Sequence, residues 1–86
     1  MTPITTEVDF RSECFMEIMS YYYSSLGIKI DPKDIYVVWQ TKALQNFKAL
    51  LSTNIPDTRY FEITYNGDKN EMYFDAYVKE KNICFN

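Results

Sequence analysis

Hydrophobic residues between positions 7 and 26 recur at the spacing of an amphipathic helix. Thr6 is a suitable N-cap, with Asp9 three residues later, and Gly27 is well placed to end the helix in a left-handed conformation. Three consecutive tyrosines, residues 21–23, cannot all face one core, so at least one should be exposed. The predicted apolar face consists of Val8, Phe15, Ile18, Met19, Tyr22 and Leu26.

After the helix, the pattern favours strands separated by turns. Residues 35–41 are rich in β-branched and aromatic side chains, which predicts a strand buried on both faces with Trp39 in the core. Residues 59–65 and 70–78 alternate between apolar and polar side chains, and the Asn66-Gly67 pair between them is a strong hairpin signal. Proline and aspartate predict turns at residues 31–34 and 54–58.

Residues 42–53 fit either a helix or a strand, because their apolar positions satisfy both spacings. We favour a turn at residues 44–46 and a strand over 46–53, since this strand would pair antiparallel with residues 35–41 through a short loop. The predicted fold is therefore α+β, with one N-terminal helix packed on a four-stranded antiparallel meander. The whole chain, residues 1–86, is expected to form a single domain.

Two registers of the second hairpin keep Phe61 and Phe74 on one buried face. A two-residue turn would place Glu62 opposite Glu71, whereas a loop over residues 66–69 would place Glu62 opposite Tyr73 and Phe61 opposite Phe74. Like charges directly opposite each other destabilise a strand pair. We therefore predict the longer loop.

Composition narrows the functions that the chain can perform. It contains eight Tyr, six Phe and one Trp but no His, and its 9 basic and 12 acidic residues leave a net charge of −3. Without histidine there is no imidazole base and no Ser-His-Asp triad, and two cysteines do not complete a zinc site. The negative charge argues against binding to nucleic-acid phosphates. We expect no enzyme activity, no cofactor, no metal site and no direct nucleic-acid contact.

The N-terminal segment and the lack of long apolar runs predict a cytoplasmic protein. The N-terminal segment has neither the basic region nor the apolar core of a signal peptide, and no apolar run approaches the ~18 residues of a membrane span. The two cysteines, Cys14 and Cys84, lie far apart and are expected to be free thiols that serve in packing.

The first candidate site is the hairpin face opposite the predicted core. If the helix covers the Phe61 side, tyrosine and carboxylate side chains on the other side stay exposed. Tyrosine is enriched at protein interfaces, and carboxylates suit a basic partner. The alternative is an ordinary solvated sheet face. The residues are Tyr60, Glu62, Thr64, Glu71, Tyr73, Asp75 and Tyr77.

A second candidate site combines aromatic and basic side chains. Tyr36 and Trp39 could stack on a base while Lys42 and Lys48 hold a phosphate, as in nucleotide binding. The alternative is that Trp39 is part of the core and both lysines are simply solvated.

Two segments, residues 34–53 and 60–79, resemble a family of small proteins of unknown function encoded by phages and prophages of Gram-positive bacteria. The most specific parts are Tyr-Asn-Gly-Asp-Lys at 65–69 and Asp-Ala-Tyr at 75–77. The family has no assigned activity, so the resemblance assigns no role to any residue. It implies a context in which small acidic proteins act by binding host components.

We therefore expect a protein that binds and inhibits a host protein in the infected cell, for example a component of antiviral defence. The alternatives are a protein that sequesters a nucleotide signal and a structural or assembly component of the virion. A second copy of the chain is a further candidate partner, and no membrane contact is expected.

Overall fold

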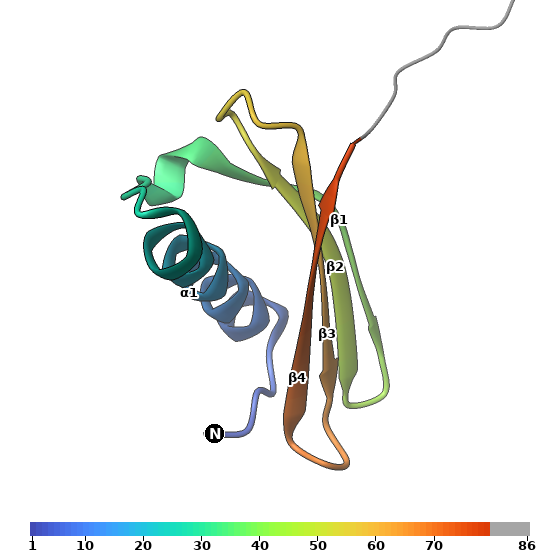
Figure 1. Cartoon of the computed structure of the whole chain (residues 1–86). Coiled ribbons are helices and arrows are strands. Elements are labelled where there is room, and N and C mark those ends of the chain that lie inside the picture. The colour runs from blue at the N-terminus through green and yellow to red at the C-terminus, as the bar shows by residue number, and fades with distance from the viewer. Residues whose placement is uncertain (80–86) are drawn as a thin grey trace, which may run out of the picture.

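One helix and four strands build the chain over residues 1–79, which the computed structural model describes. The order is α1 (Glu7–Leu26), a short 3-10 helix η1 (Pro32–Asp34), β1 (Ile35–Ala43), β2 (Asn46–Thr53), β3 (Arg59–Asn66) and β4 (Glu71–Val78). The strands form an antiparallel meander in sequence order, with the helix on one face (Figure 1). The predicted fold class is confirmed, and residues 46–53 form a strand.

The predicted ends of α1 are also confirmed. The Thr6 Oγ1 accepts a hydrogen bond from the Asp9 amide at 3.0 Å, which satisfies one free donor of the first turn. Gly27 has φ 66°, and its amide closes the last turn of the helix. Among the three adjacent tyrosines Tyr23 is the exposed one, at 68% of its full surface.

The predicted apolar face of the helix was only partly right. The fully buried residues are Phe10, Cys14, Ile18 and Tyr22, in steps of four. Val8 is 63% exposed and Leu26 is also exposed, although both were predicted to be buried. Residues four apart are neighbours on a helix surface, so this stripe forms a continuous ridge inclined to the axis of α1, and Val8 lies on the other side of the helix from Phe10.

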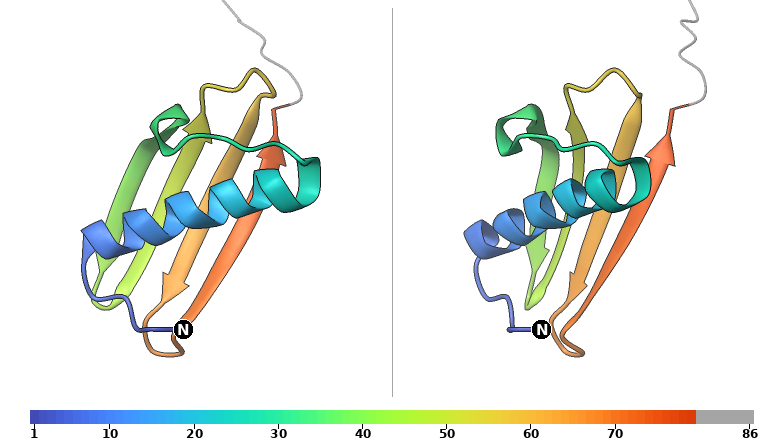
Figure 2. Two further views of the ribbon diagram at one scale, coloured as in Figure 1. Left: turned by 90° about the vertical axis from the view of Figure 1, so that its left-hand side faces the viewer. Right: turned by 60° about the vertical axis from the view of Figure 1, so that its left-hand side comes forward.

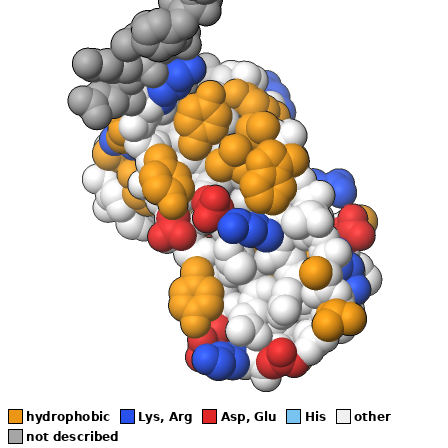
Figure 3. Space-filling model, turned by 90° about the vertical axis from the view of Figure 1, so that its right-hand side faces the viewer, with side chains coloured by type: hydrophobic (Ala, Val, Ile, Leu, Met, Phe, Trp, Pro, Cys, Tyr) orange, Lys and Arg blue, Asp and Glu red, His pale blue; other side chains and the backbone are white. Residues whose placement is uncertain are grey.

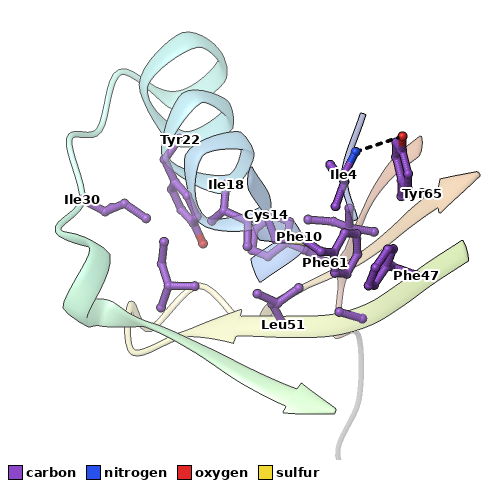
Figure 4. Packing of buried hydrophobic residues seen from close by; sticks show 13 residues of the cluster. Ile4, Phe10, Cys14, Ile18, Tyr22, Ile30, Phe47, Leu51, Phe61 and Tyr65 are labelled. Atoms are coloured by element: carbon purple, nitrogen blue, oxygen red, sulfur yellow. Dashed lines mark hydrogen bonds between the residues drawn. The ribbon is translucent and has the colours of Figure 1, made fainter. Parts of the chain in front are cut away.

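The ridge of α1 packs on the inner face of the sheet, as Figures 2 and 4 show. The Phe10 ring stacks on Phe47 of β2 with centroids 5.2 Å apart, and Tyr22 meets Phe61 of β3 edge-on at 5.8 Å. Aromatic pairs of this geometry add stabilisation beyond the area that they bury. The buried hydrophobic residues of the sheet's inner face are Ile35, Phe47, Ala49, Leu51, Phe61, Ile63 and Tyr65.

Strand β1 is not buried on both faces, contrary to prediction. It lies at the edge of the sheet, and its register with β2 shifts between Val37 and Trp39, where Val38 forms a β-bulge. The extra residue reverses the alternation of side chains beyond it. Trp39 therefore lies opposite Leu50 and is 41% exposed, rather than in the core with Val37.

The predicted register of the second hairpin was wrong by two residues, since Phe61 lies opposite Ala76 and not opposite Phe74. Asn66 pairs with Glu71, so the loop spans residues 67–70 and Glu62 lies opposite Asp75. The loop is held by side-chain hydrogen bonds: Asn66 Oδ1 accepts from the amide of Asp68 at 3.0 Å. Lys48 lies 3.6 Å from Glu62 and offsets the repulsion between the facing carboxylates.

A buried hydroxyl joins the last turns of α1 to the loop between β2 and β3. The Tyr22 hydroxyl donates to Asp57 Oδ2 at 2.7 Å, and the same oxygen accepts from Arg59 at 2.9 Å. Burial alone would raise the pKa of Asp57, but the hydrogen bonds from Tyr22 and Arg59 outweigh it and hold that pKa below its ordinary value. Burial is the main cause that raises the pKa of Tyr22 to about 12.

Removal of this hydroxyl should weaken the fold. We expect Tyr22→Phe to lower the free energy of unfolding by about 1–2 kcal/mol, because a hydrogen bond to a charged, partly buried carboxylate is lost while the ring remains. Urea denaturation measures the change. Tyr23→Phe is the matched control, since Tyr23 is exposed, and it should leave stability unchanged.

The depressed pKa of Asp57 predicts a pH dependence. Because the folded-state pKa lies below the ordinary 3.8, the carboxylate stabilises the fold above that pH. This contribution is lost as the pH falls through the folded-state pKa. Asp57→Asn should therefore be less stable than the wild type at neutral pH, and the difference should narrow in acid. Urea denaturation over a range of pH tests this, and a gap that stays constant would contradict it.

Candidate functional site

The outer face of the sheet, opposite α1, brings the first predicted site together with Tyr36, Trp39 and Lys48 of the second. The pairing of the strands arranges its side chains in rows that cross the sheet from β1 to β4. The first row is Tyr36, Ser52, Tyr60 and Tyr77, the second is Trp39, Leu50, Glu62 and Asp75, and the third is Thr41, Lys48, Thr64 and Tyr73. Glu71 lies beyond the third row on β4.

Apolar side chains gather in the first two rows. Tyr36 is 43% exposed and Tyr77 is 49% exposed, although large aromatic side chains are usually more buried. Figure 3 shows hydrophobic side chains grouped over one half of this face, with charged groups beside them. We call this set the outer patch, and its members are Tyr36, Trp39, Leu50, Tyr60 and Tyr77.

Carboxylates border the outer patch. Glu62 is paired with Lys48, with 3.6 Å between Oε1 and Nζ. Asp75 is exposed and has no ion pair within residues 1–79. At the start of β4 the Tyr73 hydroxyl donates to Glu71 Oε2, and this hydrogen bond raises the pKa of Tyr73. Asp75 is thus the acidic group most available to a cation from outside.

The predicted nucleotide-binding residues do not all converge. Tyr36, Trp39 and Lys48 lie on the outer face, but the bulge at Val38 turns Lys42 to the side of the helix. There the Lys42 Nζ lies 5.5 Å from the centre of the Phe47 ring and donates to the Leu44 carbonyl at 2.5 Å. Lys42 therefore interacts with its own turn and with the edge of the core.

Sequence reasoning missed one apolar residue of the outer patch and separated the others. Leu50 was assigned no role in either site, yet it lies between Trp39 and Glu62 in the second row. Once residues 46–53 are taken as a strand, alternation with the buried Ala49 and Leu51 would have placed Leu50 on the outer face. The bulge has no comparable signal in the sequence.

Other chemistry is limited over the described part of the chain. Burial, more than the neighbouring Glu13 and Glu17, raises the pKa of the free thiol of Cys14 to about 12, so this thiol is protonated and shielded. Cys84 lies outside the described residues. Within residues 1–79 no three metal-binding side chains come together, no pocket is found, and no helix is long and apolar enough to cross a membrane.

Comparison with known proteins adds a family. The model of a family described as "Family of unknown function (DUF6275)" matches residues 11–86. The chain belongs to this family. The match covers most of α1 and all four strands of the DUF6275 protein. No curated protein and no solved structure matches it significantly.

The Tyr73–Glu71 contact is open to a direct test. Glu71→Gln should lower the pKa of Tyr73 toward the ordinary 10.0, because the acceptor loses its negative charge. The measurement is an NMR titration of ring-labelled tyrosine. Glu62→Gln is the control, because Glu62 lies one strand away and pairs with Lys48, and it should leave the Tyr73 titration unchanged.

Proposed function

We propose that this protein acts by binding another protein through the outer face of its sheet. The observation that carries the proposal is the outer patch, in which large aromatic side chains lie half-exposed across the strands. Tyrosine and tryptophan dominate the residues that contribute most to binding energy at protein interfaces. They supply contact area with few rotatable bonds, so they lose little conformational entropy when they bind.

The charges beside the outer patch define the chemistry of the partner. Asp75 and Glu62 lie in its second row, and Glu71 lies farther along β4, with Lys48 as the nearest basic group. A surface of this kind complements an apolar area edged by lysine or arginine. Opposite charges of this type speed up association and select against acidic proteins.

A protein partner is better supported than a nucleotide. A nucleotide site needs basic groups that converge on a phosphate, yet Lys42 lies on the helix side and Lys48 faces Glu62. The outer patch also spans β1 to β4 as an open sheet surface (Figure 3). Small ligands bind mostly in concave sites that bury most of their surface.

The resemblance to phage and prophage proteins supports a bacterial host protein as the partner. Inhibition is the consequence that we propose, because a chain of 86 residues that covers a functional surface of a larger protein blocks access to it. A component of antiviral defence is the partner class that this context favours.

The test compares paired surface variants. The wild type and the double variant Trp39→Ser with Tyr77→Ser are used to capture proteins from a Gram-positive host lysate, and the partner's affinity is then measured with purified protein. We expect the double variant to bind at least about tenfold more weakly, since two aromatic side chains of the outer patch are lost. The single variant Asp75→Lys should also weaken binding, because its positive charge repels a basic partner. The loss of affinity should be larger at low salt, where charges are screened less.

Tyr23→Ser is the matched control, because Tyr23 is an exposed aromatic residue on α1, away from the outer face. It should retain the partner fully. A partner that binds the wild type and the double variant equally would contradict the proposed surface. Circular dichroism confirms that each variant is folded.

A further inference from the structure

We propose that two copies of the chain associate through β4, strand against strand and antiparallel, to form one continuous sheet across a two-fold axis. The contact is the free edge of the sheet, which adjoins the outer patch because Tyr77 lies on β4. The proposal does not rest on the proposed function, and it is tested without any partner.

The edge of β4 carries unpaired backbone groups. The Lys79 amide donates to the Thr58 carbonyl at 2.8 Å, so this residue points its backbone groups toward β3. Backbone groups alternate in direction along a strand, which turns those of Tyr77, Asp75 and Tyr73 toward β3 as well. The residues between these have amides and carbonyls that point away from the sheet, and they are Met72, Phe74, Ala76 and Val78. Within residues 1–79 no further strand pairs with this edge of β4.

The two edges of the sheet differ in their protection. On β1 the bulge at Val38 interrupts the edge, and Lys42 places a charge on the inner side. Both are devices that prevent one sheet from pairing with another. Strand β4 has neither: its register with β3 is unbroken, and residues 71–78 contain no proline, glycine or lysine.

Apolar side chains at the edge of β4 remain uncovered. On the inner face Phe74 is partly buried against Tyr21 of α1, with ring centroids 5.6 Å apart. Beyond it Ala76 is exposed and Val78 is 61% exposed, although their partners on the core face of β3 are Phe61 and Arg59. A second copy of β4 would cover part of this apolar edge.

The charges on β4 favour one register of the pair over its two nearest alternatives. With Phe74 on the two-fold axis, Tyr73 lies opposite Asp75 of the second copy and Glu71 lies opposite Tyr77. Both are pairs of a carboxylate with a tyrosine. The two nearest registers that still put inner side chains opposite inner side chains have the two-fold axis on Tyr73 or on Asp75. An axis on Tyr73 places Glu71 opposite Asp75, and an axis on Asp75 places Asp75 opposite itself. Like charges in these positions destabilise a strand pair.

The same register satisfies the backbone. Phe74 faces Phe74 and Met72 faces Ala76, and all of these residues have backbone groups that point away from β3. Such pairs exchange two hydrogen bonds each in an antiparallel ladder, or about six over the contact. The inner apolar side chains meet on one face and the tyrosine–carboxylate pairs on the other.

The first measurement is the molar mass of the full chain in solution, by sedimentation equilibrium over the micromolar range. The monomer mass is 10.3 kDa, and the wild type should approach twice that value. Ala76→Lys should remain monomeric, because it places an ammonium group in the seam opposite Met72. Val8→Lys adds the same charge at an exposed site on α1 and should still dimerise.

A second measurement on the wild type keeps the test decisive if Ala76→Lys folds poorly. Hydrogen exchange by NMR should show the amides of Met72, Phe74 and Ala76 protected as strongly as those of Tyr73 and Asp75. This protection should fade on dilution, as the dimer dissociates. A monomeric wild type, a dimer that Ala76→Lys does not affect, or freely exchanging edge amides in the dimer would each overturn the proposal.

Discussion

One helix covers one face of a four-stranded sheet, and most features of this protein follow from that constraint. The ridge of Phe10, Cys14, Ile18 and Tyr22 fills the inner face, where the aromatic rings of β2 and β3 meet it. No second layer covers the other face within the described residues. The aromatic residues of that face, such as Tyr36 and Tyr77, are therefore half-exposed.

The C-terminal end of the helix is attached to a loop as well as to the core. The Tyr22 ring is buried in the core, and its hydroxyl donates a hydrogen bond to the carboxylate of Asp57 in the β2–β3 loop. At the other end of the sheet the buried hydroxyl of Tyr65 accepts from the Ile4 amide (Figure 4). The same hydroxyl donates to Asn70 Oδ1. Buried tyrosines thus hold the loops and the N-terminal segment, because a buried hydroxyl requires partners and its ring cannot move to find others.

Much of the fold was predictable because its signals are local. Thr6 and Gly27 mark the ends of α1 by their own conformations, and alternation along residues 59–65 needs only the period of a strand. Strand β2 was less certain, since its pattern also fits a helix, but the short connection to β1 favoured the correct choice. Cys14 was expected to be a free thiol that serves in packing, and it lies buried within the ridge.

The sequence by itself determined the fold class, the ends of α1 and the faces of the β3–β4 hairpin, since each depends on neighbours along the chain. Tertiary structure alone decided where Trp39 and Lys42 point, because one extra residue at Val38 reverses the alternation and is stabilised only by pairing with β2. It likewise decided the hairpin register, which depends on side-chain bonds within the turn and on Lys48 from a neighbouring strand. Contacts between distant segments also joined two apparently separate sets of residues into one outer patch.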